Sequence, residues 1–354
     1  MAEAPWPRRQ RVPEIEARRV LSPQAEQDYR AIRYCVERSH GSPLARSRFL
    51  KKLEKNWRQG RVMPSAGTGA WRKALCCARI MLGDYSRWDG WEYRSDYAAN
   101  LWLNRPLPIP IWDGGPTRKL LVLAEEGIGD EVLFMSLLPE AIVRCGFNIV
   151  VECDARLRGI LERSFRVQTV TRLVTLTHIR EWARDQGFSA WILMGDLARY
   201  FRRDKSHFPG KPYLKPDPAR VAEMERFRGR IGVSWSGNHG RYDPEQFIRG
   251  DWVNLQYDAT HPRAQEPGID LKADIEGLFA LVSALSRVVS VSTSIAHIAG
   301  SIGTPVEVIH APYASGGKND QDILNWKWGA EGATPWYGSA KVFINLNHYV
   351  ACGG

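Results

Sequence analysis

The chain has 354 residues, of which 44% are hydrophobic, enough apolar material for two domains with real cores. No apolar run reaches the roughly 18 residues of a membrane-spanning helix, and the first residues lack the apolar stretch of a secretory signal peptide, so we expect neither. The net charge of +10 is uneven: residues 1–117 carry 21 Lys and Arg against 12 Asp and Glu, whereas residues 118–354 carry 28 against 27. The basic excess of the first region favours nucleic acid, anionic lipid or an acidic protein surface as a partner, although a solvated helical surface has the same composition.

The N-terminal region is predicted to be a basic arm, a helical domain and a linker. Residues 1–22 are rich in Pro and Arg and favour an extended arm. Residues 23–101 have helical periodicity, with helices predicted over 25–38, 44–58 and 70–82. Residues 102–117 contain four prolines and are interpreted as a linker.

From residue 118 onward, strands alternate with helices, a pattern typical of parallel sheets. In the first series the strands are predicted over 119–123, 148–152, 167–170 and 190–194, with helices from Val132 and over 155–164. A second proline-rich segment, 209–218, is interpreted as a crossing between two lobes. The second series has strands predicted over 230–235, 251–256, 288–291 and 306–309, with helices over 219–227, 276–285 and after Ser294. The sequence therefore predicts two α/β lobes that follow a helical N-terminal domain.

Six cysteines are present, at spacings that do not suggest metal ligands (Cys35, Cys76, Cys77, Cys145, Cys153 and Cys352). The simplest interpretation is that they are reduced thiols in a cytoplasmic protein.

The first strand of the first lobe leads into a turn with two glycines and an aspartate. Gly127 and Gly129 allow a sharp turn and a close backbone approach to a ligand. Asp130 stands at the start of the next helix, where a carboxylate often caps the helix but where a general base would also sit. The third glycine of a dinucleotide-binding fingerprint is missing, which makes a Rossmann dehydrogenase a poor fit.

The segment 288–310 predicts a buried strand, a polar turn, a short helix and a second buried strand. Ser292, Thr293 and Ser294 are residue types that cap helices through their hydroxyls. A helix start at the end of a strand offers unpaired N–H groups to a phosphate, and His297 lies one turn further on. An ordinary capped helix with a packed histidine fits the same pattern.

Several segments, in chain order, resemble the heptosyltransferase-like family of GT-B glycosyltransferases, in the form that follows tetratricopeptide repeats. They are 82–94 (LGDYSRWDGWEYR), 125–130 (EEGIGD), 233–238 (VSWSGN), 289–300 (VSVSTSIAHIAG) and 334–337 (TPWY), the last with Trp326 and Trp328. The resemblance covers roughly residues 70–344. It implies two Rossmann-like lobes, 118–212 and 213–354, with a cleft between an acceptor side and a nucleotide-sugar side.

The resemblance also implies the roles of individual residues. Asp130 falls on the position of the general base, which removes a proton from the acceptor hydroxyl in an inverting transfer. The donor would be bound by Gly127, Gly129, Ser236, Gly237, Asn238, Arg241, Ser292, Thr293, Ser294 and His297. The nucleotide-sugar is then a co-substrate, no cofactor is bound, and no metal is expected because no D-x-D motif stands where a metal would be needed.

Three functional classes stay open at this point. The leading one is a metal-independent, inverting glycosyltransferase whose acceptor is a nucleic acid (hydroxylated bases in DNA, for example), a protein or a glycolipid. The second is a non-catalytic scaffold with degenerate lobes, because Ser292 replaces the aspartate of the family pattern. The third is another nucleotide-dependent enzyme on the same fold, such as an epimerase.

Overall fold

The computed structural model describes residues 69–86, 88, 90–94, 107–125, 127–172, 176–237, 240–310, 326–329, 332–343 and 345–353, with scattered residues between 26 and 55. The basic arm, the predicted tetratricopeptide-like repeats before residue 69, residues 95–101 of the predicted helical domain and residues 102–106 of the predicted linker lie wholly or mostly outside this part of the chain. The scattered residues are helical, in agreement with the first two predicted helices. The third predicted helix is present as α3, Gly69–Met81.

The first lobe is a four-stranded parallel sheet in the order β3-β2-β1-β4. Its strands are β1 (Leu120–Leu123), β2 (Ile149–Cys153), β3 (Gln168–Thr171) and β4 (Ala190–Leu193). Its α-helices are α5 (Ile128–Met135), α6 (Leu138–Cys145), α7 (Arg158–Phe165), α8 (Leu176–Asp185) and α9 (Ala198–Phe201). Strands β1, β2 and β4 are buried along their whole length, as expected for parallel strands whose faces are covered by connecting helices.

The second lobe is a six-stranded parallel sheet in the order β12-β11-β10-β5-β8-β9. Its strands are β5 (Ile231–Ser234), β8 (Trp252–Asn254), β9 (Ala264–Gln265), β10 (Arg287–Val291), β11 (Val306–Ile309) and β12 (Ala340–Phe343). Its α-helices are α10 (Pro218–Glu223), α11 (Ile275–Ala284), α12 (Ser294–Ile302) and α13 (Leu346–Ala351). A small antiparallel hairpin, β6 (Ser236–Gly237) with β7 (Gly240–Arg241), follows β5.

The predicted fold class, α/β with two Rossmann-like lobes, is confirmed, because each lobe is built on its own parallel sheet. Each strand predicted from the sequence is present, with its ends displaced by at most two residues. No helix in the described part of the chain is long and apolar enough to cross a bilayer.

One predicted helix is divided in two. The apolar spacing from Val132 to Leu138 suggests a continuous helix, but α5 ends at Met135 and α6 begins at Leu138. Pro139 lies in the first turn of α6. A proline lacks the N–H that would bond to the carbonyl four residues earlier, and its ring clashes there, so the helix restarts with Pro139 at a position that tolerates it.

The second half of the predicted linker is packed onto the first lobe. Trp112 donates its backbone N–H to the carbonyl of Trp191 (2.8 Å), and Trp191 donates to the carbonyl of Pro110 (3.0 Å). Ile111 pairs with Trp191 in parallel register, so this segment runs along β4 as a short additional strand. Trp112 is buried. Residues 110–112 therefore add a short bridge to the edge of the sheet beside β4.

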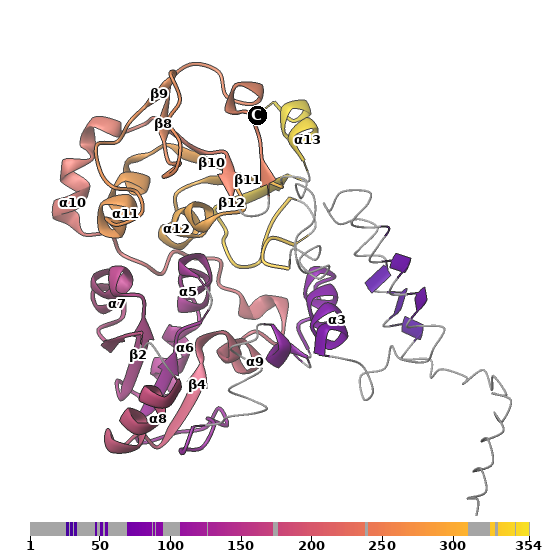
Figure 1. Ribbon diagram of the computed structural model, residues 1–354, viewed down its shortest axis with the longest axis vertical. Helices are drawn as coiled ribbons and strands as arrows, with labels where there is room; N and C mark the ends of the chain where they lie inside the picture. The colour runs from indigo at the N-terminus through magenta and orange to yellow at the C-terminus, as the bar shows by residue number, and fades with distance from the viewer. Residues whose placement is uncertain are drawn as a thin grey trace, which may run out of the picture.

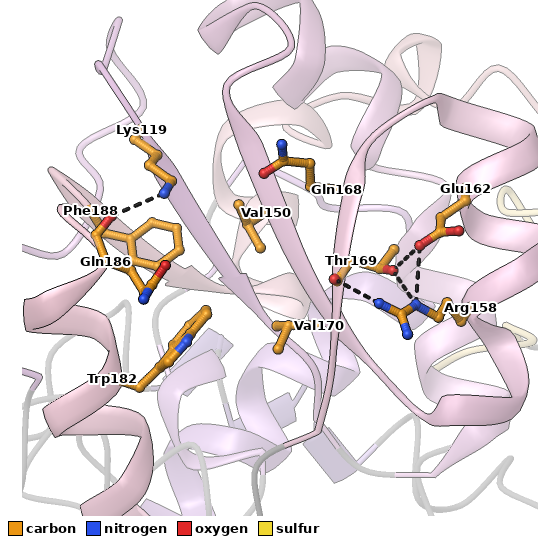
Figure 2. Close-up of a pocket in the computed structure, with 10 residues that line it drawn as sticks. All are labelled: Lys119, Val150, Arg158, Glu162, Gln168, Thr169, Val170, Trp182, Gln186 and Phe188. Atoms are coloured by element: carbon orange, nitrogen blue, oxygen red, sulfur yellow. Dashed lines mark hydrogen bonds and ion pairs between the residues drawn. The ribbon is translucent and has the colours of Figure 1, made fainter.

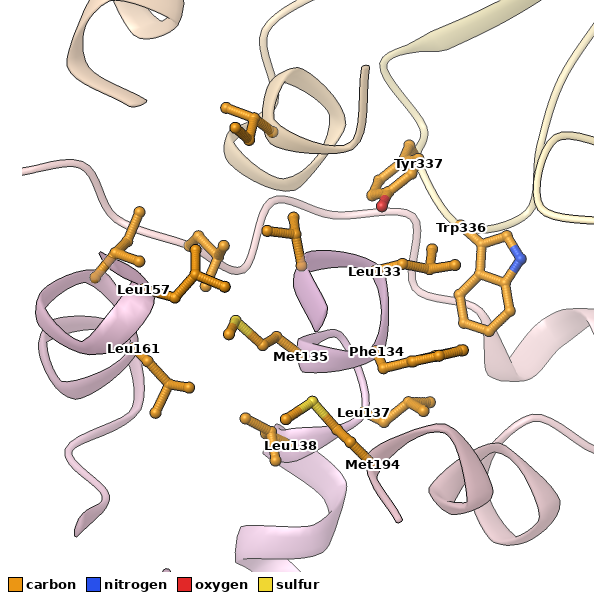
Figure 3. Packing of buried hydrophobic residues seen from close by; sticks show 14 of the residues in the cluster. Leu133, Phe134, Met135, Leu137, Leu138, Leu157, Leu161, Met194, Trp336 and Tyr337 are labelled. Atoms are coloured by element: carbon orange, nitrogen blue, oxygen red, sulfur yellow. The ribbon is translucent and has the colours of Figure 1, made fainter. Parts of the chain in front are cut away.

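The two lobes meet where α5 packs against α12, below and above the boundary in Figure 1. Side chains of both lobes form one apolar cluster there: Figure 3 shows Leu133 and Phe134 of α5 close to Trp336 and Tyr337 of the second lobe. The ring of Trp326 stacks on Phe134 with centroids 6.1 Å apart. The apolar core is therefore continuous from one lobe to the other.

A buried ion-pair network ties the segment that precedes the lobes to the first sheet. Arg94 forms two hydrogen bonds of 2.7 Å to the carboxylate of Glu125, at the end of β1, and one of 2.9 Å to Asp196, after β4. The side chains of both acids are 0% exposed. Nearby, the indole N–H of Trp91 donates to the carbonyl of Gly195 (2.9 Å). Glu125, the first acidic residue of the EEGIGD segment, therefore has a structural role.

Replacing Arg94 by Met should lower the free energy of unfolding by about 3–5 kcal/mol, because two buried carboxylates lose the charge that compensates them. Urea denaturation measures this. The matched control is Arg228→Met, which removes an exposed pair with Glu225 and should leave the midpoint nearly unchanged. Equal effects of the two substitutions would contradict the structural role of the network.

Candidate active site

The predicted site residues lie at the topological switch points of the two sheets. In the first lobe, the chain reverses its direction of sheet growth between β1 and β4, and in the second between β5 and β10. Residues 127–130 follow β1, residues 236–237 follow β5, and residues 292–294 follow β10. Ligands of open parallel sheets bind outside the carboxyl ends of the strands at such points.

The structure brings the two helix starts into direct contact. A Cβ atom on Gly129 would lie 3.1 Å from Cδ2 of His297 and 3.3 Å from Cα of Ser294. The small residue that the sequence assigns to a close ligand approach is thus required by the contact between α5 and α12. Gly127, the residue before α5, has open space around its Cα, which leaves the turn itself accessible to a ligand.

Asp130 forms an ion pair across the lobe boundary. Its carboxylate contacts the ammonium group of Lys327, which belongs to the second lobe, and it also accepts a hydrogen bond from the backbone N–H of Gly127. The side chains of Asp130 and Lys327 are 18% and 25% exposed. Burial alone would raise the pKa of the Asp130 carboxyl, but the Lys327 charge outweighs it and the pKa is lowered. Asp130 is therefore ionised at neutral pH and held by a cation.

Helix α12 begins without the side-chain cap that the sequence predicts. Thr293 precedes the helix in extended conformation, but no side-chain hydrogen bond caps the first turn. Its hydroxyl lies 3.1 Å from that of Ser290, while Ser292 accepts a hydrogen bond from the indole N–H of Trp328 (2.8 Å). The prediction that these hydroxyls cap the helix is therefore wrong, because both bind other side chains. The uncapped first turn keeps the partial positive charge that favours an anion.

His297 is packed inside the second lobe. Its ring stacks on Trp328 with centroids 4.5 Å apart, and Nδ1 shares a hydrogen bond of 2.9 Å with the hydroxyl of Tyr337. Burial, with a smaller contribution from the Lys327 charge, lowers the pKa of His297 to about 3, so the imidazole is neutral at physiological pH. This geometry gives His297 a packing role at the helix contact, and its predicted contact with the donor stays a prediction.

The remaining predicted donor residues lie at the end of β5. Ser236 donates its backbone N–H to the side-chain oxygen of Gln256 (3.0 Å) and pairs with Arg241 in the hairpin. A Cβ atom on Gly237 would lie 2.8 Å from Cγ2 of Thr293, so this hairpin touches the turn before α12. The guanidinium-bearing Arg241 is exposed. Asn238 lies outside the described residues.

Two charged residues at this site went unrecognised in the sequence. Lys327 stands between Trp326 and Trp328, where the aromatic residues carried the resemblance and the lysine gave no separate signal. Glu131 follows Asp130 but turns to other partners: it accepts a hydrogen bond from the Asp154 backbone (2.9 Å) and pairs with Arg172. Burial, only partly offset by Arg172, raises the pKa of Glu131 to about 7.

Two surface hollows lie away from this site. One of about 370 Å³ is bordered by α7, α8 and the strand β3, and its lining includes Trp182 and Phe188 (Figure 2). The other, of about 560 Å³, borders Asn148 and Lys119, which precede β2 and β1. The second hollow lies at the amino ends of the strands, opposite to the edge that carries Asp130, whereas the first runs along β3 from Gln168 to Val170. No predicted site residue lines either hollow. Ligand chemistry on a parallel sheet belongs to the other edge.

Among the residues that the structure describes, no group of three or more His, Cys, Asp or Glu is placed to hold a metal ion. Metal independence stays a prediction from the sequence.

No protein-family model matches this chain. It is 28% identical over 311 residues to Protein FlbA of Caulobacter vibrioides (strain ATCC 19089 / CIP 103742 / CB 15), a stretch that covers 74% of this chain and 50% of that protein. The chain thus spans about half the length of the curated relative it matches. The name of that relative specifies no activity.

Two solved structures resemble this chain at a distance. The Escherichia coli ADP-heptose lipopolysaccharide heptosyltransferase II aligns with a TM-score of 0.44 and 13% identity, over 64% of this chain and 90% of that one. A family 9 glycosyl transferase of Veillonella parvula DSM 2008 aligns with a TM-score of 0.42 and 12% identity, over 64% and 86%. At these values, function has to be argued from the site itself.

The raised pKa of Glu131 predicts a specific pH dependence of stability. The folded protein holds this proton up to about pH 7, whereas the unfolded chain loses it near the ordinary glutamate pKa of about 4.5. The stabilising contribution is therefore complete below about pH 4.5 and is lost as the pH rises through 7, a change of about 3 kcal/mol. Glu131→Gln cannot titrate and should flatten the pH profile of the unfolding free energy by this amount between pH 4.5 and 7.5.

Glu162→Gln is the control of opposite sign. A hydrogen bond from Thr169 lowers the pKa of the exposed Glu162 carboxyl, so its contribution is present above the unfolded pKa and is lost as the pH falls. Denaturant titrations at several pH values compare the two variants. An unchanged profile in Glu131→Gln would show that folding does not raise the pKa of Glu131.

Proposed function

We propose that this chain is an inverting glycosyltransferase that moves a sugar from a nucleotide-sugar donor to an acceptor hydroxyl. The observation that carries the proposal is the contact between the starts of α5 and α12. It puts a half-buried carboxylate, Asp130, beside an uncapped helix start although the two are far apart in the sequence. An acid group on one lobe and an anion-binding helix start on the other are what such a transfer requires.

The chemistry follows from this pair. The acceptor oxygen attacks the anomeric carbon of the sugar while Asp130 accepts its proton. The bond between the anomeric carbon and the phosphate oxygen breaks on the opposite face, and the nucleoside diphosphate leaves with the bonding electrons. Backbone N–H groups at the start of α12, after Thr293, would stabilise the departing negative charge. Attack from the face opposite to the leaving group inverts the anomeric centre.

The donor residues of this proposal lie on both sides of that helix start. Ser236, Gly237 and Asn238 would line the donor side, and the exposed Arg241 would add charge for the phosphates. In this proposal the helix start and basic side chains neutralise the leaving group, so no metal is invoked. Gly127 would let the turn after β1 approach the sugar.

The proposed acceptor is a polyanion, for which charge is the only support. The excess of Lys and Arg lies in residues 1–117, ahead of the two lobes. Deletion of residues 1–60 should therefore weaken binding of DNA at low salt without changing donor binding. DNA binding that persists unchanged after the deletion, or no DNA binding at all at low salt, would count against a nucleic-acid acceptor.

A second candidate is a non-catalytic scaffold, and two contacts favour it. The carboxylate of Asp130 is paired with Lys327, and the hydroxyl of Ser292, at the position of the family's aspartate, is bonded to Trp328. A scaffold would release no nucleotide from any donor. An epimerase would turn over a donor without transferring it.

Asp130→Asn should reduce transfer by roughly 10²–10⁴-fold, since a neutral amide cannot take up the proton, while donor binding is retained. UDP, GDP, ADP, CMP and dTDP sugars are first screened by thermal shift; a true donor at 100 times Kd raises the free energy of unfolding by about 2.7 kcal/mol. Release of free nucleotide then measures turnover of the selected donor.

Asp185→Asn is the matched control, because this carboxylate is exposed and remote from the helix contact. Its turnover should equal that of the wild type. Wild-type turnover in Asp130→Asn would rule out the base assignment, and absence of turnover with every donor would favour the scaffold.

A further inference from the structure

Lys327 is fixed at the lobe boundary by the two tryptophans that flank it. Trp326 stacks on Phe134 of α5 and meets Trp91 edge to face, with centroids 4.7 Å apart. Trp328 is 0% exposed and donates its indole N–H to Ser292 (2.8 Å), two residues before the start of α12. One indole is thus anchored on the first lobe and the other on the second. The lysine between them is held where the two helix starts meet.

The ion pair with Asp130 has a chemical cost for a general base. A carboxylate that compensates a partly buried ammonium resists protonation, because taking up a proton would leave the ammonium unpaired. The lowered pKa of Asp130 has this cause. In the pair as it stands, Asp130 is a weaker base than a free aspartate, so catalysis needs something else to compensate Lys327.

A diphosphate at the start of α12 meets that need. Ser292 lies in the turn two residues before α12 begins, and the indole of Trp328 is hydrogen-bonded to it. Lys327 is the neighbour of Trp328 in the sequence, so its backbone lies close to this turn. A diphosphate bound to the first-turn N–H groups would present several charged oxygens there. A flexible lysine stem can exchange a carboxylate for a phosphate oxygen without movement of its backbone.

We propose that Lys327 is a ligand of the donor diphosphate, and that Asp130 and the diphosphate compete for it. This inference rests on the proposed function and adds an order of events to it, in which the donor binds before the base is active. Donor arrival draws Lys327 away from Asp130, and the released carboxylate becomes available to the acceptor hydroxyl. The base is thus activated only when the leaving group is in place.

Competition has a signature that a structural ion pair lacks. In calorimetric titrations with UDP, GDP, ADP, CDP and dTDP, Asp130→Asn should bind the preferred nucleoside diphosphate roughly tenfold more tightly than the wild type, because the carboxylate no longer competes for Lys327. Lys327→Met should bind it roughly tenfold more weakly. Lys327→Arg, which keeps the charge, should stay close to the wild type. In Asp130→Asn/Lys327→Met the tightening should disappear.

Each other result overturns the inference in a distinguishable way. If both single variants weaken binding, the ion pair only holds the lobes together. If Asp130→Asn tightens binding equally in the Lys327→Met background, removal of negative charge acts without Lys327. If all four proteins bind equally, Lys327 is no ligand, while the proposed function stands. If no nucleoside diphosphate binds any of them, the proposed function fails with the inference.

Discussion

The structure depends on one close approach, that of the start of α5 to the start of α12. Gly129 permits it, because any side chain at this position would meet the His297 ring and the backbone of Ser294. The contact joins the carboxyl-end edges of two separate sheets at their switch points. It places Asp130 of the first lobe next to the turn that begins α12 in the second. Without it, the acid group and the helix start would belong to unrelated surfaces.

The surroundings of the contact are built to maintain it. An aromatic cluster that includes Trp91, Phe134, Trp326 and Trp336 crosses the boundary through edge-to-face ring contacts. At the carboxyl ends of β1 and β4, the buried guanidinium of Arg94 compensates the negative charges of Glu125 and Asp196. Without this compensation, burial of the two carboxylates would destabilise the fold. The segment that precedes the lobes is therefore fixed to the same sheet that presents Asp130. Packing and charge compensation position the acid group together.

The polar groups at the lobe boundary have other partners than they would have in an ordinary capped helix. The hydroxyls before α12 bind Trp328 and Ser290, which leaves the first turn of the helix without a side-chain cap. The helix therefore lacks a stabilising cap, and the N–H groups of its first turn can bind an anion instead. His297 is too buried to be charged and acts as a neutral spacer between α12 and Tyr337. The charge that matters at this boundary is that of Asp130 and Lys327.

The sequence by itself determined the order of most strands and helices, because buried parallel strands consist of short apolar runs whose ends are marked by Gly, Pro and Ser. It also located Asp130, Gly129 and the turn at Ser292, since residues at strand ends must lie on one edge of a parallel sheet. It missed α8, whose apolar positions are interrupted by charged residues, and β12, a strand of four residues that follows an irregular segment. Only the tertiary structure decided that the hydroxyls of Ser292 and Thr293 leave α12 uncapped, that Glu125 pairs with Arg94, and that Lys327 meets Asp130. Those pairings join residues from different elements and lobes, and a local pattern holds no information about partners that the chain brings together only when it folds.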